Sequence, residues 1–336
     1  MKHLHLSIVC VALFCVAVRS ADAVVAFKTI TQDAAEAAVK AAKDEAAKLE
    51  SPIYKPAKTK MHIHVLGREG TLMAASQANG AWPGSDDIAT RKARTSLAFG
   101  FPTRAVGELS RPDKEAKGPL YGIELSNGGL ITFPGGVPLL DADGNLCGAI
   151  GVSGDSVDMD EKVALAGAEA FKALKDATVA LSALTQSAAV SIAIAAKSKS
   201  ETTDSGMLKD KDGKFKKTRM FIRVVGVDGS VLAACGSEEA WKGSDDIAQR
   251  KAKTALLFKL PTRTIGELSR PELKDKGPLY GIEISNDALI TFPGGLPLMD
   301  DKGNCVGAIG VSGDTVDKDE EVAKAGVEVF NKMMKK

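Results

Sequence analysis

Gly118-Pro119-Leu120-Tyr121-Gly122-Ile123-Glu124 recurs unchanged as Gly277-Pro278-Leu279-Tyr280-Gly281-Ile282-Glu283. The offset of 159 (218 − 59) begins where Thr59 matches Thr218 and holds without a gap to the C-terminus. About six positions in ten are identical over this stretch, a degree of internal similarity that chance does not produce. The sequence therefore predicts two copies of one small domain.

The boundary between the copies follows from a second alignment. Thr31-Gln32 matches Thr185-Gln186 at an offset of 154 (185 − 31), so the second copy has five additional residues, which we place in a lengthened surface loop at 209–217. We assign residues 28–177 to copy 1 and 178–336 to copy 2. Because almost no linker separates them, we expect the copies to pack as an intramolecular pseudo-dimer.

The first 23 residues differ from the rest and have the pattern of a signal peptide. Lys2 precedes an apolar run from Leu6 to Val18, and Ala21-Asp22-Ala23 is a small-x-small cleavage pattern. We expect export to the extracellular space, the periplasm or an endomembrane lumen. The alternative is the plastid of a complex alga. No later stretch has the length of a membrane span, so we expect no membrane contact after cleavage.

Composition excludes some partners. Lys and Arg number 44 against 43 Asp and Glu, so no basic footprint favours nucleic acid. Three cysteines remain after the signal, Cys147, Cys235 and Cys305, and they form no CxxC pair. We interpret them as small apolar strand residues, with one Cys235–Cys305 disulfide as the alternative.

Each copy predicts the same order of elements, α-β-β-α-β-β-β-α. In copy 1 we expect a helix over 31–49, strands at 61–66 and 71–76, a helix capped by the Ser85 hydroxyl, and, after a crossover, strands at 130–133, 138–140 and 147–152 before a helix opened by Asp160. The first helix of copy 2 is expected over 180–197. This order implies the α/β (α+β) class, with an antiparallel sheet flanked by helices.

Three ordered blocks carry a family resemblance in both copies. In copy 1 they are Gly84-Ser85-x-x-Ile88-Ala89-x-x-Lys92-Ala93, Phe133-Pro134-Gly135-Gly136-x-Pro138-Leu139, and 148–154 with Asp160-Glu161 after it. In this the chain resembles the GlcG/HbpS-like family over nearly all of its mature length. The resemblance implies two tandem domains, each with a five-stranded antiparallel sheet, assembly into oligomers, and heme as a cofactor that some members also degrade.

His62 and His64 are the only histidines beyond the signal, and strand alternation places both on one face. They are candidate ligands for heme iron or a divalent metal. Copy 2 has Phe221 and Arg223 at these positions, so such a site belongs to copy 1 alone. The alternative is a pair of partly exposed sheet residues without a ligand.

Two further groups of candidate site residues occur in both copies. Phe133, Gly135 and Gly136, with Phe292, Gly294 and Gly295 in copy 2, form either a backbone cradle for an anion such as a heme propionate or a tight turn. The crossover residues have guanidinium groups suited to carboxylates and a tyrosine that can stack on a porphyrin or ligate iron, or they are solvated charges. They are Arg104, Arg111 and Tyr121, and Arg263, Arg270 and Tyr280.

Other catalytic motifs are excluded. The glycines of 148–154 lack GxGxxG spacing and lie in an expected antiparallel strand, and GVSGD lacks the spacing of a nucleophile elbow. Three hypotheses remain: an exported protein that binds heme or another tetrapyrrole in or between its copies, with degradation as an extension; a cofactor-independent enzyme acting on a small carboxylate; and a structural module.

Overall fold

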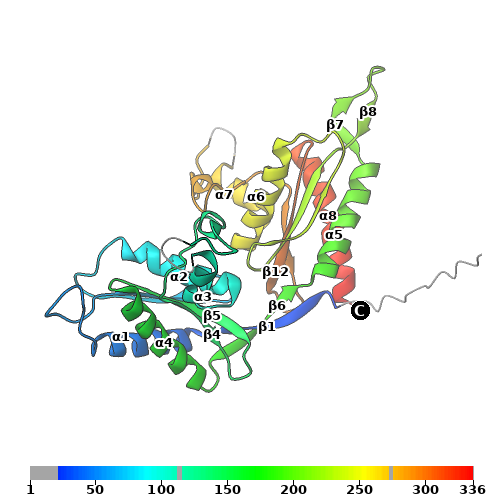
Figure 1. The fold of residues 1–336 in the computed structure, drawn as a ribbon. Helices are drawn as coiled ribbons and strands as arrows, with labels where there is room; N and C mark the ends of the chain where they lie inside the picture. Colours follow the sequence, from blue (N-terminus) through cyan, green and yellow to red (C-terminus); the bar gives the residue numbers. More distant parts are fainter. Residues whose placement is uncertain (1–21, 112–115, 272–274, 336) are drawn as a thin grey trace, which may run out of the picture.

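A computed structural model describes residues 22–111, 116–271 and 275–335, and its two halves repeat one arrangement (Figure 1). Both copies contain four sheet strands, three α-helices around the sheet, one short α-helix and one 3-10 turn. The elements of copy 1 are α1 Gln32–Ala46, β2 His62–Gly67, β3 Leu72–Gln77, α2 Ser85–Phe99, α3 Thr103–Ser110, η1 Ile123–Leu125, β4 Gly136–Leu140, β5 Leu146–Ser153 and α4 Val157–Ala173. Those of copy 2 are α5 Gln186–Thr202, β9 Phe221–Gly226, β10 Val231–Gly236, α6 Gly243–Phe258, α7 Thr262–Ser269, η2 Ile282–Ile284, β11 Gly295–Met299, β12 Cys305–Ser312 and α8 Val316–Met334.

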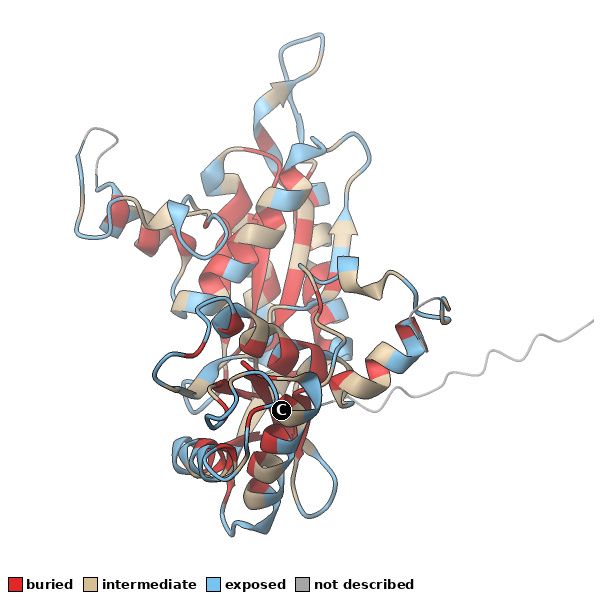
Figure 2. Ribbon diagram, turned by 60° about the vertical axis from the view of Figure 1, so that its left-hand side comes forward, coloured by how far each residue is buried: buried red, intermediate tan, exposed pale blue. Residues whose placement is uncertain are grey.

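The sheet of each copy is antiparallel and lies between two helical layers. Its strand order is β3-β2-β5-β4 in copy 1 and β10-β9-β12-β11 in copy 2. In copy 1, α1 and α4 pack together and cover one face, while α2 covers the other. Alternation along β2 sends Ile63 and Val65 to the core under α1 and α4, and sends Leu66 to α2. The buried residues follow these two interfaces (Figure 2).

A two-stranded ribbon joins the copies. β1 (Val24–Ile30) pairs antiparallel with β6 (Thr178–Leu184), and Phe27 lies opposite Leu181, its own equivalent at the offset of 154. The ribbon therefore has a pseudo-two-fold axis at its centre, as in an isologous dimer contact. Ala23, just before β1, is buried in the core of copy 2, and its carbonyl accepts the Thr185 N–H at 3.1 Å. The intramolecular pairing expected from the short linker is present; assembly into higher oligomers stays a prediction.

The structure corrects several expected elements. Residues 180–184 are strand rather than helix, because they pair with β1, and α5 begins only after the Thr185 cap. Residues 130–133 form no strand: the Ile131 N–H donates to Thr95 Oγ1 of α2, so each main sheet has four strands instead of five. Ser85 is the first buried residue of α2 and not its cap, since Gly84 precedes it without a side-chain bond.

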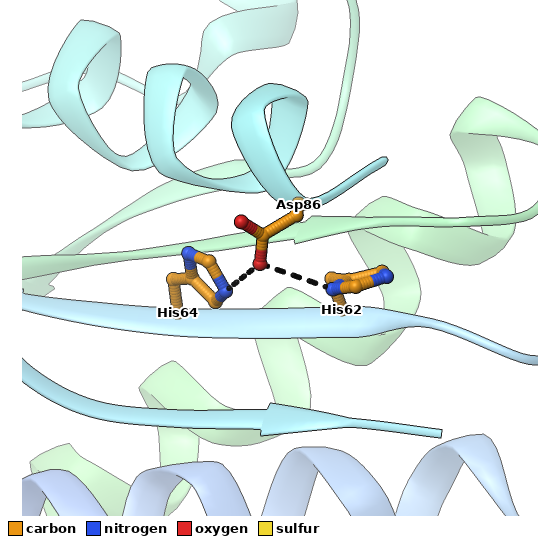
Figure 3. Close-up of side chains that lie close together, drawn as sticks. All are labelled: His62, His64 and Asp86. Atoms are coloured by element: carbon orange, nitrogen blue, oxygen red, sulfur yellow. Dashed lines mark ion pairs between the residues drawn. The ribbon is translucent and has the colours of Figure 1, made fainter. Parts of the chain in front are cut away.

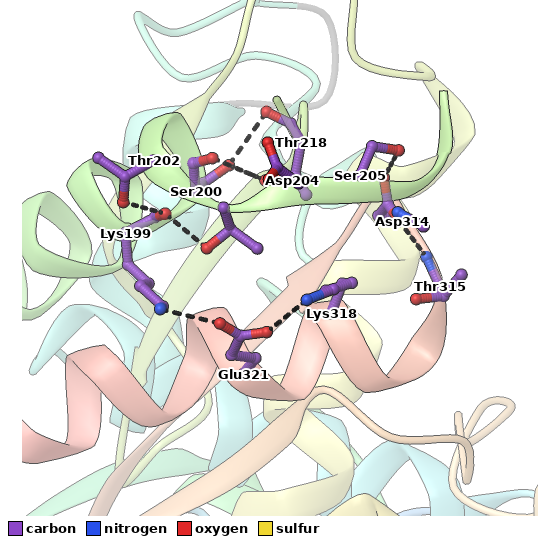
Figure 4. Close-up of polar contacts among 12 residues, drawn as sticks. Lys199, Ser200, Thr202, Asp204, Ser205, Thr218, Asp314, Thr315, Lys318 and Glu321 are labelled. Atoms are coloured by element: carbon purple, nitrogen blue, oxygen red, sulfur yellow. Dashed lines mark hydrogen bonds and ion pairs between the residues drawn. The ribbon is translucent and has the colours of Figure 1, made fainter. Parts of the chain in front are cut away.

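The additional residues of copy 2 form a hairpin that projects from the domain (Figure 1). Its strands are β7 (Asp204–Lys209) and β8 (Phe215–Lys217), and polar contacts to α5 and α8 hold its base (Figure 4). Ser205 donates to the buried Asp314 carboxylate just before α8, and Lys217 Nζ donates to the carbonyl of Thr202, the last residue of α5, at 2.9 Å. The lengthened loop is thus an anchored hairpin.

The cysteines lie on strands, as expected. Cys147 is buried, Cys235 and Cys305 are half-buried, and all three are free thiols, so the alternative disulfide does not form. Within the described part of the chain, no helix combines the length and apolar character needed to cross a membrane. Most of the expected signal peptide, residues 1–21, lies outside the described residues.

Candidate functional site

A pocket of about 580 Å³ opens on the crossover of copy 2. This volume is within the range of sites that hold drug-sized or cofactor-sized ligands. Of the residues expected from sequence, Arg263, Arg270, Tyr280 and Phe292 all line it. Its other walls come from α7 and from the segment around η2. They are Gly266, Glu267, Gly281, Glu283, Ile284, Thr291 and Pro293. The crossover therefore gathers four predicted side chains around one cavity.

Tyr280 forms the centre of a cationic stack. The Arg270 guanidinium lies 4.8 Å and the Lys276 ammonium 4.7 Å from its ring centroid. Copy 1 repeats the arrangement, with Arg111 at 4.9 Å and Lys117 at 4.6 Å from the Tyr121 ring. Both tyrosines are nearly half exposed, so each copy presents an aromatic ring flanked by two positive charges to solvent.

Arg104 and Arg263 are engaged with their own copies. Arg263 donates from Nε to Glu320 and from Nη2 to Asp317, both at 2.6 Å, and Arg104 makes the same bonds to Glu161 and Asp158 at 2.7 Å. Hydrogen bonds to the glutamate and then to the aspartate raise the pKa of each guanidinium. These two arginines fix α3 and α7 to the closing helices, whereas no comparable ion pair of Arg111 or Arg270 occurs among the described residues.

The Gly135-Gly136 pair packs inward. The Gly136 N–H already donates to Thr103 Oγ1 at 2.9 Å, and a Cβ at Gly136 would overlap the Lys92 carbonyl oxygen. Gly135 has φ of 124°, which strongly favours glycine. Gly294 and Gly295 repeat both features. This geometry favours the tight turn over the anion cradle and positions the neighbouring Phe at the pocket wall.

A buried ion pair supports this turn. Lys92 Nζ donates to Asp160 Oδ2 at 2.7 Å and to the Val152 carbonyl at 2.8 Å, and the side chains are 0% and 2% exposed. Lys92 Nζ also lies 4.8 Å from the Phe133 ring centroid. Burial lowers the pKa of Lys92 and raises that of Asp160 to about 6. The ion pair of copy 2, Lys251 and Asp319, has the same spacing beneath Phe292.

Glu283 is a structural acid of the pocket wall. It accepts hydrogen bonds from Ser269 Oγ at 2.6 Å and Thr291 Oγ1 at 3.0 Å. Burial acts to raise the pKa of Glu283, but these two bonds and one from its own backbone lower it overall. Its charge is therefore held by hydroxyl groups, and it ties the crossover to α7.

The histidines form a separate cluster. His62 and His64 project from β2 towards the first turn of α2, where Asp86 Oδ1 lies 3.2 Å from His62 Nδ1 and 3.1 Å from His64 Nε2 (Figure 3). Both rings are buried rather than partly exposed. Burial lowers the pKa of His64 despite the carboxylate. The strand alternation that placed them on one face is correct, but the copy 2 pocket is not lined by the equivalent residues, Phe221 and Arg223.

A second cavity, of about 390 Å³, lies between the copies. Phe27 and Leu181 at the ribbon centre line it together with side chains of both signs, including Glu69, Asp228 and Lys253. Acids and bases line the pocket at Arg270 and Tyr280 as well, so what distinguishes that pocket is an aromatic ring between two cations.

Sequence reasoning missed several residues of these sites. Asp86 is not among the residues predicted from sequence, and Lys92 and Asp160 enter there only through the family motifs and the start of the closing helix. The sequence does indicate the ion pair through one lysine among alanines, Lys92 in copy 1 and Lys251 in copy 2. Each lies at a buried position of its helix, α2 or α6. Lys117 and Lys276 lie next to the repeated Gly-Pro-Leu-Tyr segment and could have been predicted from it.

Several known proteins are similar to part of this chain. An uncharacterised 15.0 kDa protein from Citrobacter freundii is 32% identical over 111 residues, which is 33% of this chain and 75% of that protein. The corrinoid adenosyltransferase PduO of Salmonella typhimurium is 28% identical over 111 residues, 33% of this chain but 32% of the enzyme. A crystal structure described as a PduOC:Heme complex is 26% identical, covering 42% of this chain and 94% of that one, with a TM-score of 0.37.

The family described as "Haem degrading protein HbpS-like" matches residues 30–169 and 207–328, one segment in each copy and well over half of the chain together. The two segments contain the pocket residues, the buried ion pairs and the histidine cluster described above. The chain therefore belongs to the HbpS-like family, whose domain it contains twice in tandem.

Proposed function

We propose that this protein binds heme or a related planar tetrapyrrole in the crossover pocket of copy 2 and at the equivalent position of copy 1. The observation that carries the proposal is the pocket of about 580 Å³ in which Arg270, Tyr280 and Phe292 meet. The family description, which names heme as a ligand class, supports the same assignment.

The residues present fit such a ligand. An aromatic and aliphatic wall, in which Ile284 is 88% exposed, suits the face of a macrocycle, while Arg270 and Lys276 suit its carboxylates. Among the residues lining the pocket, Tyr280 is the one with a side chain of a type known to ligate heme iron. Arg111, Lys117 and Tyr121 supply the same groups in copy 1.

The test is a hemin titration of the purified chain lacking its signal. We expect a Soret shift that saturates near two equivalents, at protein concentrations of about 10 µM. Replacing Arg270 and Tyr280 with Ala removes the copy 2 wall and should leave one equivalent, and adding Arg111→Ala and Tyr121→Ala should leave none. His64→Arg is the matched control and should not change the titration. No shift in the unmodified protein would refute the proposal.

The proposal extends to slow heme degradation, in line with the family description. Its check is a loss of the Soret band over hours in the loaded protein with a reductant in air, faster than in the same concentration of hemin mixed with the pocket-deficient variant. The alternative, an enzyme that acts on a small carboxylate, receives less support. The groups expected to bind that carboxylate, Arg104, Arg263 and the Gly136 N–H, already have partners within the protein.

We further propose that the chain is exported. The supporting pattern is the apolar run that precedes Ala21-Asp22-Ala23. Expression in a secretory host followed by N-terminal sequencing tests it: a mature chain that begins close to Val24 is expected, and a chain that retains Met1 inside the cell would contradict it.

A further inference from the structure

We propose that His62, His64 and Asp86 form a binding site for one divalent transition-metal ion in copy 1, separate from the tetrapyrrole pocket. The three ligand atoms, His62 Nδ1, His64 Nε2 and one Asp86 carboxylate oxygen, all lie within 4.8 Å of one another. They come from two rigid elements, the strand β2 and the first turn of α2, whose packing fixes their approach (Figure 3).

Two of the three ligand spacings match a coordination shell. Metal–ligand bonds of about 2.1 Å place neighbouring ligands about 3.0 Å apart in an octahedron and about 3.4 Å apart in a tetrahedron. The two nitrogen-to-oxygen separations, 3.2 and 3.1 Å, fall between these values, whereas the two imidazole nitrogens lie within 4.8 Å of each other, so the rings have to turn towards a shared ion on binding. The Asp86 side chain is 63% exposed, so an ion can enter from solvent beside it while both imidazoles approach from the protein side.

The contact of the second His64 nitrogen fits ligation at Nε2. His64 Nδ1 is 2.7 Å from Thr90 Oγ1, so its other nitrogen, Nε2, is the one turned towards Asp86. His62 Nε2 is buried without a hydrogen-bond partner, although unpaired buried polar atoms cost about 1–3 kcal/mol. Copy 2 has an apolar Phe221 at this position, so the fold does not require a histidine here. A metal ion at Nδ1 leaves Nε2 unpaired, but it gives this histidine a function that the fold itself does not supply.

Copy 2 shows what the same backbone does without the histidines. The Arg223 guanidinium forms an ion pair with Asp245, the equivalent of Asp86, and lies 5.6 Å from the Phe221 ring centroid. A fixed side-chain cation therefore neutralises the aspartate in copy 2. In copy 1 two imidazoles replace the aromatic ring and the fixed cation, so Asp86 faces two side chains of a type that ligates metal ions.

The donor set selects the class of ion. Two imidazoles and one carboxylate suit Zn²⁺, Fe²⁺ and their first-row neighbours, whereas Mg²⁺ and Ca²⁺ prefer oxygen ligands throughout. Three protein ligands also leave further coordination positions for water or a small ligand.

The test is a Co²⁺ titration of untagged, chelator-treated protein, followed by the visible absorption of nitrogen-ligated Co²⁺. We expect one equivalent for the unmodified chain, with Zn²⁺ displacing it and a large excess of Mg²⁺ having no effect. His64→Arg, which reproduces the copy 2 ion pair with Asp86, should bind none. The reciprocal variant Phe221→His/Arg223→His should bind two.

Folding controls keep the result interpretable. Circular dichroism and the fluorescence of Trp82 report whether His64→Arg retains the native copy 1, and Asp86→Asn, altered at an exposed position, provides a second variant that should weaken Co²⁺ binding at least tenfold. An unmodified protein that binds no Co²⁺ below about 100 µM, or binding that survives in both native variants, would overturn the site. Neither result depends on hemin binding, so this site and the tetrapyrrole pocket fail independently.

Discussion

Replacing Asp160 with Asn should destabilise copy 1 by about 3–5 kcal/mol. The substitution keeps an oxygen to accept the Asp155 N–H, a bond of 3.1 Å in the structure, but it removes the negative charge from beside Lys92. The ammonium is then buried with only the Val152 carbonyl and the Phe133 ring as partners. Breaking a buried ion pair on one side typically has a cost of this size.

The upper limit follows from the lysine itself. Lys92 can escape the unfavourable charge by losing its proton, which at pH 7 costs about 4.6 kcal/mol because the pH lies about 3.4 units below the usual lysine pKa. Lys92→Met leaves the carboxylate instead. Since burial already raises the pKa of Asp160 to about 6, this acid takes up a proton more cheaply, and the variant should lose less stability.

The assay can follow each copy separately. The chain has two tryptophans, Trp82 in copy 1 and Trp241 in copy 2, so Trp241→Phe leaves a reporter for copy 1 alone and Trp82→Phe one for copy 2. Urea unfolding of Asp160→Asn should shift only the Trp82 transition. The matched Asp319→Asn should shift only the Trp241 transition. A loss below 1 kcal/mol in both variants would refute the view that these pairs are essential to the core.

Three further predictions use the same reporters. Gly136→Ala should unfold copy 1, because its Cβ would lie 2.6 Å from Thr103 Cγ2 and would overlap the Lys92 carbonyl. Gly84→Ala has open space around its Cβ and should hardly change the stability of copy 1. Equal effects of the two substitutions would contradict this. Val24→Asp should destabilise copy 2 more than copy 1, because Val24 packs against the core of copy 2. A shift confined to the Trp82 transition would refute this contact between β1 and copy 2. In metal-free protein, burial lowers the pKa of His64 in the folded state, so the unfolded chain binds more protons. The free energy of unfolding should therefore fall as the pH drops below about 6.5. His64→Arg should flatten this pH dependence, and an unchanged profile would mean that another group causes it.

The sequence was sufficient for the duplication, the antiparallel class and most of the elements, because these follow from periodicity and from a repeat that shows the same pattern twice. It misled where tertiary contacts override local preference. Residues 180–184 have helix-compatible alanines, but the pairing of β6 with β1 depends on a partner 154 positions away. Likewise, the Ile131 N–H bonds to Thr95 of α2 rather than to a neighbouring strand.

The candidate site was predictable in residue types but not in grouping. Arg270, Tyr280 and Phe292 do meet, whereas the histidines face another helix and a carboxylate that no local pattern marked as their partner. Gly136 illustrates a further limit: a glycine that admits a ligand and one that admits a neighbouring helix give the same sequence pattern. Only the close approach of the Lys92 carbonyl separates the two interpretations.

The most direct test of the account is a titration with iron-free protoporphyrin IX, followed by its fluorescence. If the crossover arginines hold the carboxylates of the ligand and the apolar residues hold its flat face, binding needs no metal ligation. Saturation near two equivalents per chain is then expected, unchanged in His64→Arg and halved by Arg270→Ala/Tyr280→Ala. Binding of hemin but not of protoporphyrin, lost in His64→Arg, would contradict it, because the histidines and not the pockets would then hold the ligand.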